Sequence, residues 1–242
     1  ILFASIPFDY YADRAPWFAA QGVEGLMLGG IMNDWSDDVW RLGDGTRIVG
    51  EKNPLFQTCK RMNARCREAG IRSNSVKVAF YKLLPDWFDG DGWGRLCENF
   101  RQCAIFARDA GFAGVAVDIE YINGIYELTY AAYLAPVYPR ERLREQARRR
   151  GAEMMEAMLG VFPDMINWHL PEGMHFYGIL ATDLAVGMLQ ACARADAPGG
   201  FHSATGDQLA FAKVFGTRVD TVDLTAVMET YRAGKASGYL GE

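Results

Sequence analysis

The sequence predicts an α/β fold in which parallel strands alternate with helices. Six β/α units of about 35 to 40 residues follow one another with no linker between them. The predicted strand-to-helix loops are rich in Trp, Tyr and acids, whereas the helix-to-strand turns are short. Since these residues would then gather at one end of a parallel sheet, the pattern is typical of a TIM-type (β/α)8 barrel, with six of its units visible.

The elements are expected in the following order. Strands are predicted at residues 2–6, 25–29, 75–81, 114–120, 165–170 and 200–205. Helices are predicted at residues 13–21, 53–69, 94–110, 140–159, 182–194 and from 207 onward. Asn53 followed by Pro54 is a typical helix start, and Gly70 is a typical stop.

Two segments are predicted to be loops that carry polar and aromatic side chains. The first follows strand one and contains Asp9, Tyr10 and Tyr11. The second follows strand three and contains a run of acids and tryptophans, namely Asp86, Trp87, Asp89, Asp91 and Trp93. No glycine-rich phosphate-binding motif follows strand one, which argues against a dinucleotide-binding fold.

The length places the chain at the lower edge of what a barrel needs. The 242 residues are 50% hydrophobic, enough for one sizeable core, but a complete barrel typically has about 250 residues. We therefore expect residues 1–242 to be a single barrel domain that is C-terminally truncated and lacks strands seven and eight. Strands one and six would then be exposed at their edges, and the isolated piece would be inactive or aggregate.

Composition excludes several classes of partner. The net charge of −5 argues against nucleic acid or an anionic membrane. The basic run at residues 140–150 mixes both signs at helical spacing and predicts a solvated helix face. No cofactor or metal site is predicted; compartment and oligomeric state stay open. The five cysteines contain no CxxC motif and predict reduced core thiols: Cys59, Cys66, Cys97, Cys103 and Cys192.

The stretch around strand four carries the strongest functional signal. Val115, Val117 and Ile119 alternate with small residues and then with Asp118 and Glu120. Alternate strand residues face opposite sides, so both acids are expected on the inner face at the strand's C-terminal end, where barrel enzymes keep their chemistry. The structural alternative is that loop amides or an arginine satisfy these acids.

The segment GFAGVAVDIEY resembles the strand-four signature of glycoside hydrolase barrels, and in particular the end of the chitinase-type motif D-x-x-D-x-D-x-E. By this resemblance Asp118 would be the acid that orients an acetamido group and Glu120 the general acid. The first two motif positions are Ala113 and Ala116 instead of aspartates. The resemblance thus implies glycoside hydrolysis, but not substrate-assisted cleavage of N-acetyl sugars.

Glycoside hydrolysis needs two carboxyl groups across the scissile bond. We expect Asp118 to be the nucleophile or stabilising anion and either Glu120 or Glu172, which follows strand five, to be the acid. Lys77 on strand three is placed to neutralise Asp118, or else it extends to water.

Aromatic rings stack on sugars, so an oligosaccharide or glycoside substrate is predicted. The candidate substrate-binding residues are Asp9, Tyr81, Tyr121, Trp168, His169 and His202. For the two histidines, the alternative is that the ring hydrogen-bonds the backbone of a loop instead of a substrate hydroxyl. Strand one has no H-x-H pair, so a metal-dependent hydrolase is not predicted. The competing function is a carbohydrate-binding barrel without catalysis.

Overall fold

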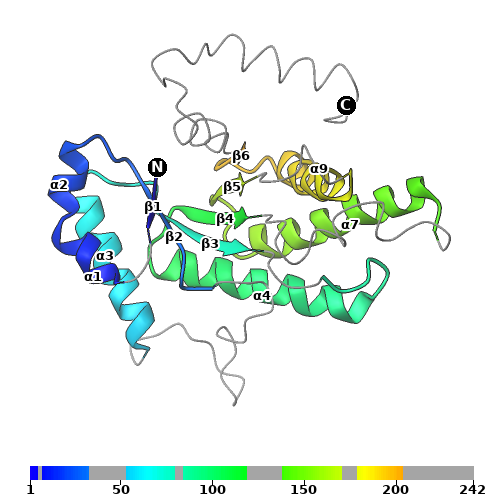
Figure 1. Ribbon diagram of the computed structural model, residues 1–242, viewed down its shortest axis with the longest axis horizontal. Helices are drawn as coiled ribbons and strands as arrows, with labels where there is room; N and C mark the ends of the chain where they lie inside the picture. The colour runs from blue at the N-terminus through cyan, green and yellow to red at the C-terminus, as the bar shows by residue number, and fades with distance from the viewer. Residues whose placement is uncertain (5–6, 33–52, 80–83, 119–137, 171–178, 204–242) are drawn as a thin grey trace, which may run out of the picture.

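The computed structural model describes residues 1–4, 7–32, 53–79, 84–118, 138–170 and 179–203 (Figure 1). These residues form six strands and six helices. The strands are β1 (Leu2–Ala4), β2 (Leu26–Leu28), β3 (Ser75–Ala79), β4 (Gly114–Asp118), β5 (Ile166–Leu170) and β6 (Phe201–Ser203). The helices are α1 (Phe8–Asp13), α2 (Ala15–Ala20), α3 (Pro54–Glu68), α4 (Gly90–Asp109), α7 (Arg140–Leu159) and α9 (Ile179–Arg194).

The six strands make one parallel sheet in the order β1-β2-β3-β4-β5-β6. Sequential strands are neighbours and helices connect them, so the predicted α/β class, strand order and direction are confirmed. In the described part of the chain, β1 and β6 each pair with one strand only. Because residues 204–242 lie outside that part, the expectation of a truncated barrel stays a prediction.

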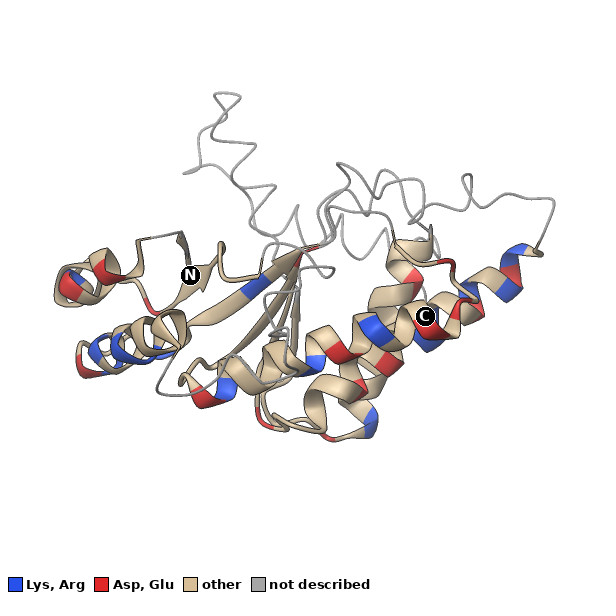
Figure 2. Ribbon diagram, turned by 90° about the horizontal axis from the view of Figure 1, so that it is seen from below, with Lys and Arg blue, Asp and Glu red and all other residues tan. Residues whose placement is uncertain are grey.

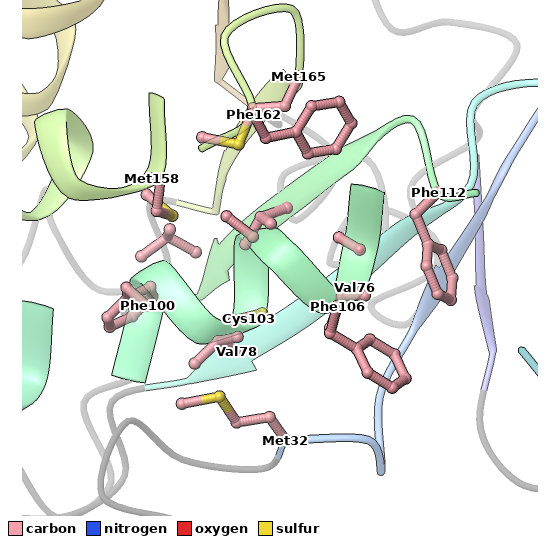
Figure 3. Packing of buried hydrophobic residues seen from close by; sticks show 14 of the residues in the cluster. Met32, Val76, Val78, Phe100, Cys103, Phe106, Phe112, Met158, Phe162 and Met165 are labelled. Carbon is pink, nitrogen blue, oxygen red and sulfur yellow. The ribbon is translucent and has the colours of Figure 1, made fainter. Parts of the chain in front are cut away.

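The two faces of the sheet differ as the alternation of residues predicts. Val76 and Val78 of β3 and Val115 and Val117 of β4 are fully buried beneath the helices. Figure 3 shows the β3 valines beside Phe100, Cys103 and Phe106 of α4, with Met158, Phe162 and Met165 nearby. The opposite, inner face of the same two strands carries small and polar residues: Ser75, Lys77, Ala79, Gly114, Ala116 and Asp118. Most of the charged residues in the described part of the chain lie on the helices instead (Figure 2).

The ends of α3 lie where the sequence places them. The Asn53 side chain accepts a hydrogen bond from the backbone N–H of Phe56 at 3.1 Å, and Pro54 occupies the first helical position. After the helix, Gly70 has a φ of +95°, a conformation that favours glycine. Local residue chemistry is sufficient to determine this element.

Two segments expected to be loops are partly helical. Asp9, Tyr10 and Tyr11 lie in α1, which packs against α3. Helix α4 begins at Gly90, four residues earlier than expected, because Asp89 caps it by accepting from the N–H of Gly92 at 2.9 Å.

The tryptophans of the second segment are core residues. Trp87 and Trp93 are fully buried and stacked, with ring centroids 5.2 Å apart. In this segment Asp89 thus serves helix capping, and Trp87 and Trp93 serve core packing.

Helix α7 also differs from its predicted role as a solvated surface helix. Arg150 is 7% exposed, donates to the carbonyl of Trp87 at 2.9 Å and lies over the Trp93 ring. Arg144 and Arg148 bond the two oxygens of Asp183 on α9, which is 1% exposed. Several basic residues of α7 therefore hold neighbouring elements, because α7 is covered by α4 on one side and α9 on the other.

Candidate active site

An ion pair joins β3 and β4 on the inner face of the sheet. Lys77 and Ala116 are register partners, as are Ala79 and Asp118, so all four side chains share this face. The Lys77 side chain extends along the strand, and its Nζ donates to Asp118 Oδ2 at 2.5 Å. The Asp118 side chain is 3% exposed and that of Lys77 is 18% exposed. Of the two alternatives for Lys77, the contact with Asp118 is therefore the one observed, and the ammonium stabilises the ionised carboxylate by Coulomb attraction.

Trp168 and His202 continue the same face on the next two strands. Trp168 is the register partner of Ala116 on β4 and of His202 on β6. The rings of Trp168 and His202 lie 5.1 Å apart, and the exposed His202 Nε2 lies 2.9 Å from the carbonyl oxygen of Gly199. The structure thus brings Asp118, Lys77, Trp168 and His202 to one face.

The inner face has an apolar part beside the ion pair. Met27, Ala116 and Leu170 form a small buried cluster, and Trp168 packs against it. The Trp168 Nε1 atom is buried and has no hydrogen-bond acceptor among the described residues. A buried indole N–H usually has a partner, so this donor is available to a ligand oxygen or to a part of the chain outside the described residues. The sequence reasoning did not identify Met27 and Leu170, although their place in the strand alternation was a usable signal.

His169 does not join this group. Its register partners are Val117 and Ser203, so it lies on the outer face with the helices. The ring is 2% exposed and stacks on Phe201 with centroids 5.6 Å apart. Adjacent residues of a strand face opposite sides, and Trp168 occupies the inner position. His169 is therefore a core residue with no access to a ligand on the inner face.

Burial of His169 gives the protein a specific pH dependence. Desolvation lowers the pKa of His169 to about 4 from its usual 6.5. Below pH 6.5 the unfolded chain takes up a proton that the folded chain does not. We therefore expect the free energy of unfolding to fall between pH 6.5 and 4 by up to about 3 kcal/mol, and this contribution to be fully present above pH 6.5.

This prediction is checked by urea unfolding at several pH values, comparing the chain with His169→Leu. The difference in pH slope between the two proteins isolates the contribution of His169. The same comparison with His202→Gln measures the effect of replacing an exposed histidine. An identical slope in His169→Leu would contradict the assignment of His169 to the core.

The remaining candidates lie elsewhere. Asp9 is on the surface of α1, where it faces Arg61 of α3 at 3.5 Å and its side chain is 63% exposed. Tyr81, Glu120, Tyr121 and Glu172 lie outside the described residues.

The cysteines and metal-ligating residues offer no second centre in the described part of the chain. All five cysteines are free. Burial raises the pKa of Cys59 to about 12 and that of Cys192 to about 11, so these thiols stay protonated. Among the described residues, no three His, Cys, Asp or Glu side chains are grouped to hold a metal ion. Nor does any described helix have the length and apolar character needed to span a membrane.

Comparison with known proteins identifies the fold. No protein-family model matches the chain, and no curated protein matches it in sequence. An old yellow enzyme homologue from Zymomonas mobilis superposes with a TM-score of 0.51 at 13% identity, covering 85% of this chain and 70% of that one. Old yellow enzyme from a Pichia species gives a TM-score of 0.50 at 11% identity, covering 81% and 61%. The fold is that of a TIM barrel.

Glycoside hydrolases also appear among the similar structures. A GH5 variant from Streptomyces cattleya in complex with Manβ1-4GlcNAc gives a TM-score of 0.43 at 16% identity, covering 68% of this chain and 40% of that one. The chain thus spans less than half of that enzyme. At 11 to 13% identity the likeness to the two old yellow enzyme structures shows the fold alone and does not identify a substrate.

Proposed function

We propose that this chain is a glycoside hydrolase whose Asp118 acts as nucleophile or stabilising anion. The observation that carries the proposal is the ion pair of Asp118 with Lys77 at the C-terminal end of β4, on the face that also presents Trp168. Barrel enzymes hold their reacting groups at this end of the strands. The paired ammonium favours the ionised carboxylate, which is the form a nucleophile or stabilising anion requires.

We propose that the proton donor is a residue other than Asp118. A general acid must be protonated when it meets the glycosidic oxygen, and a carboxylate bonded to an ammonium is poorly suited to that role. Glu120 follows Asp118 by two residues, and Glu172 follows Leu170, the register partner of Asp118, by two residues. Both remain candidates for the acid.

Trp168 is proposed to form the sugar-binding surface. An aromatic ring on the inner face offers a stacking platform for the apolar face of a sugar, and its buried N–H offers a hydrogen bond to a hydroxyl. His202, which is exposed and whose ring lies at a tilt beside that of Trp168, would extend this surface.

The proposal is tested by assaying the whole chain against a panel of aryl glycosides and, in parallel, measuring oligosaccharide binding by calorimetry. Turnover supports the hydrolase. Binding without turnover on any member of the panel supports the alternative, a carbohydrate-binding barrel. Absence of both binding and turnover would contradict both functions.

Trp168→Ala should weaken sugar binding about tenfold through loss of the stacking surface, with a smaller relative effect on thermal stability because the ring is only partly buried. Trp17→Ala is the matched control, since Trp17 lies on α2 and is 58% exposed. Titration calorimetry and thermal unfolding measure the two effects. A large stability loss with unchanged affinity would make Trp168 a packing residue only.

A further inference from the structure

Lys77 is unusual among the strand residues that the structure describes, because it is the one lysine in the six strands. Its side chain is 18% exposed, whereas Lys60 on α3 is exposed. In a surface salt bridge the Lys77 ammonium would stay in water, and holding its charge there would cost little free energy. On the inner face of a sheet the ammonium loses part of its contact with water, which costs more. The chain therefore holds a primary amine where a barrel holds its reactive groups.

Among the described residues, two of the neighbours of the Lys77 side chain are small. A side chain at Gly29 would lie 3.7 Å from Lys77 Cε, and the register partner on β4 is Ala116. Met27 and Leu170 complete the apolar cluster around Ala116. In the resting pair Lys77 is an ammonium and Asp118 a carboxylate, and the free amine forms when a proton moves from Lys77 to Asp118. The hydrogen bond between Nζ and Oδ2 supplies a direct path for that proton.

We propose that Lys77 is a nucleophilic amine that captures an aldehyde or ketone as an imine, with Asp118 as its proton carrier. A lysine reacts with carbonyl compounds only as the free amine, and an enclosed lysine beside a proton acceptor can provide that form. The inference does not rest on glycoside hydrolysis, because it needs neither a glycosidic bond nor a second carboxyl group.

The step balances with the two residues alone. Asp118 takes one proton from the Lys77 ammonium, and the free amine attacks the carbonyl carbon to form a C–N bond. A second proton passes from nitrogen to the former carbonyl oxygen, which gives a carbinolamine. Asp118 then returns its proton to that hydroxyl group, the C–O bond breaks and water leaves. The products are a protonated imine on Lys77, an ionised Asp118 and one water molecule.

The test is reductive trapping in the whole chain. Glycolaldehyde and pyruvate serve separately as aldehyde and ketone probes, sodium cyanoborohydride reduces any imine to a stable amine, and peptide mass spectrometry measures the rate at each lysine. We expect Lys77 to be modified at least tenfold faster than Lys60 by one of the probes. Asp118→Asn should slow modification of Lys77 at least tenfold and leave Lys60 unchanged.

Variants complete the design. Lys77→Arg should abolish the fast modification, whereas Lys60→Arg should leave it intact; thermal unfolding shows whether each variant is folded. The modification rates of Lys77 and Lys60 are compared within one protein, without any variant. This comparison therefore tests the reactivity of Lys77 even if Lys77→Arg does not fold. Modification of Lys77 no faster than that of Lys60 with both probes would overturn the inference. Glycoside turnover, measured separately, would be unaffected by that outcome.

Discussion

Asp118→Asn should lower kcat/KM for a glycoside substrate on the order of 10²- to 10⁴-fold, the loss expected when a reacting carboxylate is removed. The amide is nearly isosteric with the carboxylate, so folding and sugar binding should be largely retained. It carries no negative charge, however, and the Lys77 ammonium, at 2.5 Å in the native pair, would then face a neutral group. The site would lose the anion that the transition state requires.

The measurement combines steady-state kinetics on the best substrate of the aryl glycoside panel with calorimetric binding of the product sugar. Asp9→Asn is the matched control, because Asp9 is a surface acid on α1 paired with Arg61; it should leave kcat/KM unchanged within about twofold. Glu120→Gln should also abolish turnover if Glu120 is the proton donor. Turnover at the native rate in Asp118→Asn would remove Asp118 from the catalytic machinery.

Gly151→Ala should destabilise the protein by about 2 kcal/mol or more, because α7 and α9 touch at their backbones. A Cβ at Gly151 would lie 1.9 Å from the carbonyl oxygen of Leu184, and one at Gly187 would lie 1.9 Å from that of Arg148. The two helices would have to move apart by more than an ångström, which disturbs the ion pairs of Asp183. This overpacking, about 3 kcal/mol, exceeds the gain of about 1 kcal/mol from replacing a helical glycine.

Gly94→Ala supplies the matched control for that result. Gly94 lies inside α4 and is exposed, and a Cβ there would meet nothing within 4 Å. Only the helix-propensity gain remains, so Gly94→Ala should raise the unfolding temperature by a few degrees. Urea unfolding of both variants gives the free energies. A stabilised Gly151→Ala would show that the two helices are not in backbone contact.

On β5, residue type alone did not decide which of two adjacent side chains faces inward. Trp168 and His169 are adjacent, and both were assigned to ligand binding. The alternation of a strand allows only one of them to face inward. The register of β5 with β4 places Trp168 beside Ala116 and His169 beside Val117, which decides between them. Residue type had favoured both, since tryptophan and histidine are each common in binding sites.

The acids after β3 are a second case in which residue type alone did not determine the role of a side chain. From residue type alone, Asp86 and Asp89 are predicted to lie in a polar loop. They bond the backbone N–H groups of Phe88 and Gly92 instead. Short-range capping was readable from the sequence, but the stack of Trp87 on Trp93 and the contact of Arg150 with both depend on α7, more than 50 residues further along the chain.

The sequence by itself determined the α/β class, the order of the six units, the boundaries of α3 and α7, and the place of Asp118 on the inner face. These features follow from local propensity, capping and the period-two alternation of strands, which act over a few residues. Only the tertiary structure decided that Lys77 bonds Asp118, that His169 is a core residue and that α7 is held by Asp183. Each of these depends on register between strands or on packing between helices, and such contacts join residues that are distant in the chain.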